Sequence, residues 1–136
     1  MSAEETWVAL RELVMGHDRR REVSEAMGMS FARVKALRYV AARAMTGREL
    51  ATEMATDPPF ITVIVDDLER RGLVERTPHP TDRRAKVITV TPAGRRAAQK
   101  AEKILSSPPD ALRALPPEDL AALARIAAAL REPAAK

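Results

Sequence analysis

The order of elements over residues 46–94 most constrains the fold, because two short helices with clear ends are followed at once by two β-branched runs. Thr46 and Glu49 have the spacing of a capping box, in which each side chain accepts the other residue's free backbone N–H. This spacing predicts a first helix over residues 47–54. Only a brief turn separates it from the next helix, as in a helix-turn-helix unit.

The second helix has equally clear ends, since Asp57 is a good N-cap, Pro58 suits the first helical position and Gly72 is a natural stop. Its apolar residues recur at helical spacing, which predicts one buried face made of Ile61, Ile64, Val65 and Leu68. The opposite face presents Pro59, Thr62, Val63, Asp66 and Arg70.

The two β-branched runs, residues 73–76 and 86–90, are joined by a polar, proline-rich stretch, which predicts a β-hairpin with a long loop. The hairpin and its flanks, residues 69–100, hold nine Lys or Arg and three Asp or Glu, a net charge of +6 against +4 for the whole chain. A solvated basic face is one explanation of such a strip. The other is nucleic acid, because a basic hairpin can reach phosphates or the narrow minor groove. Together with the two helices, it predicts a winged helix-turn-helix whose second helix enters the major groove.

Further helices are predicted over residues 4–27, 31–43, 92–106 and 117–132. Ser30 is the expected N-cap of the second of these, and Thr91, followed by Pro92, caps the third. Alanine and leucine dominate the composition and only four residues are aromatic, which favours helix over sheet. The expected fold class is therefore mainly α with a small β-hairpin wing. A length of 136 residues suits a single domain, residues 1–136.

Composition and motifs argue against several functions. The chain has no cysteine, its five glycines are isolated, and its two histidines lie in different predicted elements. No phosphate-cradling loop, metal-ligand pair or nucleophile elbow is present, so we expect no enzyme activity, no cofactor and no metal site. The acidic N-terminus lacks an apolar leader and no apolar run is long enough to cross a membrane, so we expect a cytoplasmic protein without membrane partners.

The segment over residues 68–94 resembles the multiple antibiotic resistance regulator (MarR) family of transcription factors. LERRGLVER resembles the end of that family's recognition helix and its first wing strand. DRRAKVITVTPAG resembles the family's wing signature, with Val90 in place of a leucine and four residues in register: Asp82, Arg84, Thr91 and Gly94.

The resemblance implies a homodimeric, ligand-responsive repressor that binds a pseudo-palindromic DNA operator. It implies a DNA-binding lobe over residues 30–100, with dimerisation helices in residues 1–28 and 101–136. It also implies a small aromatic or phenolic ligand in a cleft between the dimerisation helices and the lobe, bordered by Trp7, His17, Arg21, Phe31 and Tyr39. Core or dimer-interface packing is the other interpretation of the three aromatic residues in this set.

Residue-by-residue transfer makes Arg84 the wing-tip arginine and Asp82 the carboxylate that orients its guanidinium by a charge-assisted hydrogen bond. Val63 and Asp67 stand where many relatives have basic residues. We therefore expect an apolar patch of Pro59, Thr62 and Val63 to meet thymine methyl groups. We expect Asp66 and Asp67 to form a solvated or wing-buttressing pair. The expected DNA-contacting residues are Pro58, Pro59, Thr62, Val63, Arg70, Arg76, Arg83, Arg84 and Lys86.

A second function remains open at this stage, in which the winged helix is a protein-interaction module that no longer reads DNA. The recognition helix favours it, because its exposed face has little positive charge. The basic wing opposes it, because a protein partner does not require six net positive charges along one strip.

Overall fold

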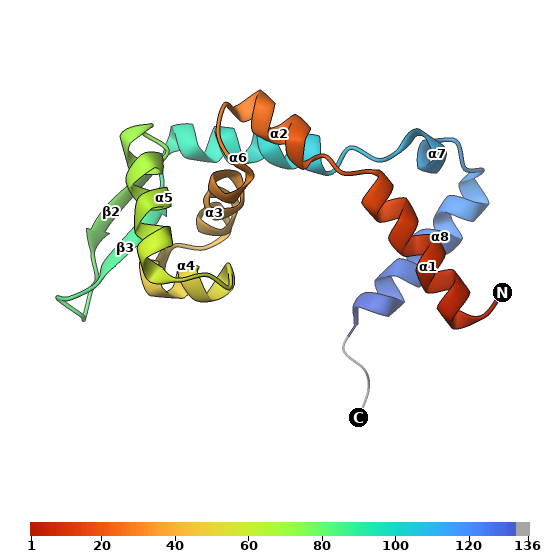
Figure 1. Ribbon diagram of the computed structural model, residues 1–136, viewed down its shortest axis with the longest axis horizontal. Coiled ribbons are helices and arrows are strands. Elements are labelled where there is room, and N and C mark those ends of the chain that lie inside the picture. Colours follow the sequence, from red (N-terminus) through yellow and green to blue (C-terminus); the bar gives the residue numbers. More distant parts are fainter. Residues whose placement is uncertain (133–136) are drawn as a thin grey trace. The chain divides into compact units, whose positions relative to one another are not determined.

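The computed structural model describes residues 1–132, and the chain divides into two compact units, one from Met1 to Ser106 and one from Ser107 onward. Along the described residues, eight helices and three short strands follow one another, so the chain is mainly helical as expected (Figure 1). Residues 133–136, the end of the predicted C-terminal dimerisation segment, lie outside the described residues.

The prediction of one continuous helix over residues 4–27 is wrong. The structure has two helices there, α1 (Ala3–Gly16) and α2 (Arg20–Met27). Between them His17 has non-helical backbone angles, and Asp18 accepts a hydrogen bond from the backbone N–H of Arg20. The Arg20 side chain also donates to the Asp18 carboxylate, and this bond, followed by the backbone one, lowers the pKa of Asp18 to about 2. Local capping at Asp18 therefore competes with helix continuation.

Three helices form the helix-turn-helix region, α3 (Phe31–Ala42), α4 (Gly47–Glu53) and α5 (Pro58–Arg70). Each begins at a predicted N-cap, because the side chains of Ser30, Thr46 and Asp57 accept hydrogen bonds from backbone N–H groups of the first turn. The capping box of Thr46 and Glu49 is also confirmed. The hydrogen bond from the Thr46 backbone N–H, and then that from Arg43, lower the pKa of Glu49.

The predicted hairpin is confirmed as strands β2 (Val74–Pro78) and β3 (Lys86–Val90), which pair antiparallel. A third strand, β1 (Met45–Thr46), pairs with the other edge of β3, so the sheet order is β1-β3-β2. Two residues are too few to show strand alternation, and β1 was not predicted. Since Met45 and Arg76 both pair with Ile88, the base of the wing is held against the start of α4.

The core of the first unit lies between the sheet and helices α2 to α6, where α6 (Pro92–Leu105) begins after the N-cap Thr91. The predicted buried face of α5 is confirmed, since all four of its residues are inaccessible or nearly so. The other large buried side chains include Val23, Val34, Leu37, Val40, Leu50, Val74 and Ile88.

The second unit contains α7 (Asp110–Arg113), which was not predicted, and α8 (Pro117–Arg131), which matches the helix predicted over residues 117–132. Within the part of the chain that the structure describes, neither α1 nor α8 has a buried residue. Both helices instead expose large apolar side chains, which include Trp7, Leu13, Val14 and Met15 on α1 and Leu120, Leu123, Ile126 and Leu130 on α8.

Candidate nucleic-acid interface

The outward face of α5 carries the residues that we expected to meet bases. Pro59, Thr62 and Val63 are all exposed, and 56% of the Val63 surface is accessible. Phe60, which was not predicted as a contact, is 46% exposed beside them. Since residues 58–64 contain no basic side chain, the first half of α5 offers solvent an apolar surface.

The first wing strand is attached to α5 by an ion-pair network around Arg76. The guanidinium of Arg76 donates to Asp66 Oδ1 at 2.6 Å and to Glu69 Oε1 at 2.9 Å. Only 24% of the Arg76 side chain is exposed. Asp66 is therefore the wing-buttressing carboxylate expected from the sequence, and two carboxylates offset the charge of Arg76.

The expectation of a solvated Asp67 beside Asp66 is wrong. Only 12% of the Asp67 side chain is exposed, and its carboxylate accepts hydrogen bonds from the guanidinium groups of Arg70, Arg71 and Arg33 at 2.5, 2.8 and 2.7 Å. These bonds, with that of Arg70 largest, hold the pKa of Asp67 well below its usual range. Consecutive helical residues point about 100° apart, so Asp66 faces the wing while Asp67 faces α3.

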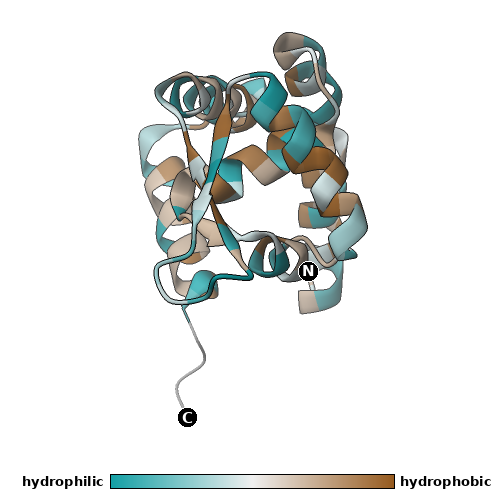
Figure 2. Cartoon of the chain, turned by 90° about the vertical axis from the view of Figure 1, so that its left-hand side faces the viewer, coloured by the Kyte–Doolittle hydropathy of each residue, from teal (hydrophilic) through white to brown (hydrophobic). Residues whose placement is uncertain are grey.

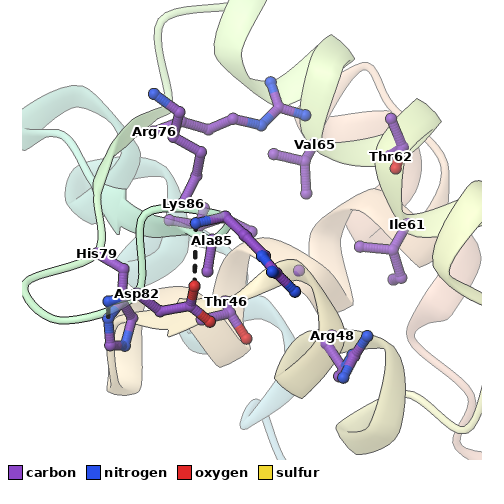
Figure 3. A pocket seen from close by; sticks show the side chains of 13 residues that line it. Thr46, Arg48, Ile61, Thr62, Val65, Arg76, His79, Asp82, Ala85 and Lys86 are labelled. Carbon is purple, nitrogen blue, oxygen red and sulfur yellow. Dashed lines mark hydrogen bonds between the residues drawn. The ribbon is translucent and has the colours of Figure 1, made fainter.

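The expected contact between the Asp82 carboxylate and the Arg84 guanidinium is corrected by the structure. Asp82 Oδ1 instead accepts a 3.0 Å hydrogen bond from the backbone N–H of Arg84 (Figure 3). The Asp82 carbonyl also accepts from the backbone N–H of Ala85. Asp82 therefore shapes the backbone of the wing turn, and the described contacts leave the Arg84 side chain exposed.

A cavity of about 530 Å³ lies between α5, the start of α4 and the wing. Four basic side chains line it together with Thr62 and the imidazole of His79. They are Arg48 of α4, Arg76 of β2 and Lys86 of β3, which Figure 3 labels, and Arg84 of the wing loop. Figure 2 views the lobe from the wing side, where the loop between β2 and β3 is mainly hydrophilic. The tertiary structure therefore gathers Thr62, Arg76, Arg84 and Lys86 from the predicted set around one basic groove.

Two residues of this groove, Arg48 and His79, were not predicted. Arg48 lies in the first turn of α4, where the helix dipole disfavours a positive charge. A basic residue at this unfavourable position could have indicated in the sequence that Arg48 binds an anionic partner. His79 precedes Pro80 at the start of the wing loop, a place where Asn or Asp commonly initiates a turn.

The remaining predicted contacts lie outside this cavity. Pro58 lines a second cavity, at the turn between α4 and α5, together with Arg48. Arg83 is exposed in the wing loop, and Arg70 is held by Asp67 at the far end of α5.

The residues expected to border a ligand cleft line neither the cavity beside the wing nor the cavity at the turn between α4 and α5. Phe31 and Tyr39 are partly buried against the core, whereas Trp7 is 63% exposed on α1. Arg21 is exposed on α2 and pairs with Glu25. His17 follows α1, where its Nε2 accepts a hydrogen bond from Arg19.

Over residues 1–132, no helix has both the length and the apolarity needed to cross a membrane. The same residues contain no group of three or more His, Cys, Asp or Glu side chains placed to hold a metal ion.

Comparison with known proteins finds one matching family model and several solved structures with a similar fold. The model of the MarR family matches residues 27–85. A mutant of MarR from E. coli superposes with a TM-score of 0.75 at 20% identity, covering 97% of this chain and 98% of that one. YusO from Bacillus subtilis gives a TM-score of 0.71 at 24% identity, covering 98% and 100% of the two chains. No curated protein sequence matches this chain.

Two further structures show relatives of this fold with bound molecules. The E. coli MarR mutant complexed with operator DNA gives a TM-score of 0.59 at 20% identity, over 97% of this chain and 100% of that one. NadR in complex with 4-hydroxyphenylacetate gives a TM-score of 0.65 at 22% identity, over 96% and 92%. At these identities the likeness establishes a shared winged-helix fold.

Proposed function

This chain belongs to the MarR family, and we propose that it is a homodimeric repressor that binds a pseudo-palindromic operator. The basic groove between α5 and the wing carries the proposal. Arg48, Arg84 and Lys86 converge there from segments that are far apart in the sequence. A helix in the major groove and a hairpin beside it leave one phosphate backbone between them, where such cations would neutralise it.

We propose that α5 reads bases through apolar contacts rather than through arginine hydrogen bonds. Val63 and Thr62 expose methyl groups on the outward face of α5, where they would meet thymine C5-methyl groups. Arg84 and Arg83, exposed in the wing loop, would enter the minor groove, where the negative potential attracts arginine.

Dimerisation follows from the apolar surface of the terminal helices. Trp7 and Val14 on α1, and Leu130 on α8, are more than 60% exposed in the single chain. Burial of such residues in an isologous interface would place two lobes about a two-fold axis, which suits an operator with two related half-sites.

The release of DNA by a small ligand is part of the same proposal. Its support is the fold shared with NadR, which was crystallised with 4-hydroxyphenylacetate. We keep an aromatic or phenolic compound as the proposed effector, with Trp7, His17, Arg21, Phe31 and Tyr39 as the residues to test.

Selection of bound duplexes from a random pool tests the DNA-binding function. We expect enrichment of a sequence with two-fold symmetry. Arg48→Ala should weaken binding to the enriched duplex, whereas the matched control Lys103→Ala should not, because Lys103 lies near the end of α6 away from the wing. An unenriched pool would contradict the proposal and favour the protein-interaction module.

A further inference from the structure

The wing loop is organised around a ring nitrogen of His79. The backbone N–H groups of Thr81 and Asp82 donate to His79 Nδ1 at 3.2 and 3.0 Å. The Thr81 hydroxyl lies 3.4 Å from the same nitrogen. Two backbone donors therefore converge on one imidazole nitrogen, and that nitrogen must carry a lone pair rather than a proton.

This arrangement reproduces a turn that Asn and Asp commonly make. Their δ1 oxygen accepts backbone N–H groups two and three residues further on. His79 Nδ1 stands at the same number of bonds from its Cα, and Pro80 follows it. The next turn continues the pattern, because Asp82 Oδ1 accepts from the backbone N–H of Arg84. The backbone position of Arg84 is thus linked to His79 through Asp82.

We propose that His79 is the positioning residue of the wing, and that DNA binding by the wing requires its imidazole to be neutral. The proposal rests on the proposed function. A proton on Nδ1 would set a third N–H against those of Thr81 and Asp82, release both bonds and free the turn that carries Arg84. DNA affinity should then fall as the pH is lowered.

The groups around His79 allow the effect of a proton on its imidazole to be distinguished from the effects of other charged groups in the cavity. The charged residues that share its cavity are Arg48 of α4, Arg76 of β2, and Asp82, Arg84 and Lys86 of the wing. The cavity residues from α5 are uncharged: Ile61, Thr62 and Val65. Histidine is the side chain whose charge ordinarily changes between about pH 5 and 8. An imidazolium that simply contacted phosphate would have the opposite effect and would strengthen binding at low pH.

NMR of the free protein tests the turn without DNA. We expect Nδ1 of His79 to be unprotonated at about pH 8, and the amide signals of Thr81 and Asp82 to shift when the pH is lowered to about 5.5. Because the chain has only two histidines, His17→Asn assigns the His79 signals. A proton on Nδ1 at the higher pH would overturn the proposal.

Binding to the duplex enriched in the selection tests the consequence. Wild-type affinity should fall about tenfold between about pH 8 and 5.5, the size of one net hydrogen bond lost. His79→Asn, whose amide oxygen can accept the same bonds, should bind within about twofold of wild type at both pH values, whereas His79→Ala should be weak at both.

Stronger wild-type binding at low pH would overturn the proposal in favour of a phosphate contact. Equal weakness of the Asn and Ala variants would overturn it in favour of ring packing. A wild-type chain that binds no duplex would contradict the proposed function itself, and the NMR experiment would still decide whether His79 organises the turn.

Discussion

Nε of Arg33 donates a 2.7 Å hydrogen bond to Oδ2 of Asp67, and this contact joins α3 to the recognition helix α5. Arg71 donates to the same oxygen and also, through Nη1, to the carbonyl of Gly28 at the end of α2. The Asp67 carboxylate is therefore turned away from the face of α5 that we propose to meet DNA, and together with Arg71 it connects α5 to α3 and α2.

Asp67→Asn should lower the Tm at neutral pH, because three guanidinium groups would remain close together without their shared carboxylate. The hydrogen bonds of Arg70, Arg71 and Arg33 lower the pKa of Asp67 in the folded state, so the folded chain binds fewer protons than the unfolded one. The stabilisation is complete above about pH 4 and decreases as the pH falls below it.

Thermal unfolding of both proteins at several pH values measures this effect. The Tm difference between wild type and Asp67→Asn should shrink below about pH 4. Asp66→Asn is the matched control, and its smaller effect should reflect an exposed ion pair. A difference that is constant with pH would contradict the prediction.

Gly94→Ala should destabilise the lobe. A Cβ on Gly94 would lie 1.9 Å from the carbonyl oxygen of Leu73, and that oxygen also accepts a hydrogen bond from the Thr91 backbone N–H. We expect the free energy of unfolding, measured in urea, to fall by roughly 2–3 kcal/mol. Gly47→Ala is the control: its Cβ would meet open space at the start of α4, so the change should be under about 1 kcal/mol. Equal losses would exclude the close approach as the cause.

Arg84→Ala should weaken binding to the enriched duplex by roughly 1–3 kcal/mol if the wing arginine contacts bases or a narrow minor groove. The measurement compares the enriched and a random duplex at one fixed salt concentration. Equal losses on both duplexes would reduce Arg84 to a phosphate contact. No loss on either would mean that the wing is only a solvated basic face.

Replacement of thymine by uracil in the half-sites should weaken binding if Thr62 and Val63 meet thymine methyl groups. Each buried methyl contributes on the order of 0.8 kcal/mol, so several contacts in a symmetric operator amount to roughly tenfold or more in affinity. Val63→Ala supplies the control, since the uracil penalty should be smaller in that variant. An unchanged affinity of the wild type for uracil-containing duplex would show that this surface does not read methyl groups.

Leu130→Glu should dissociate the proposed dimer, because Leu130 is exposed in the single chain and a charge there would lie among the apolar side chains that the proposed interface buries. Arg131→Glu introduces the same side chain at the neighbouring position of α8 and should leave the dimer intact. Sedimentation of both variants gives the answer. A Leu130→Glu dimer as stable as wild type would place the interface elsewhere.

Much of the lobe follows from interactions within a few residues of the chain. The N-caps Ser30, Thr46, Asp57 and Thr91 bind the first turn of their own helices, so their positions in the sequence predicted where α3 to α6 begin. The buried face of α5 could likewise be predicted, because the helical spacing of its apolar residues is also a local pattern. The split between α1 and α2 was missed. The backbone leaves the helical conformation at His17, and Asp18 accepts a hydrogen bond from the backbone N–H of Arg20, where α2 begins.

The sequence by itself determined the helix-turn-helix, the hairpin and its excess of positive charge, because caps, periodicity and turn residues act locally. Only the tertiary structure decided what individual charged and polar groups do. Asp66 and Asp67 are neighbours in the sequence, yet one binds the wing and the other binds α3. Likewise, Arg48 and His79 became part of one basic groove only when β1 paired with β3, because that pairing brings the start of α4 beside the wing. Such roles depend on which distant segments pack together, and no local pattern records that packing.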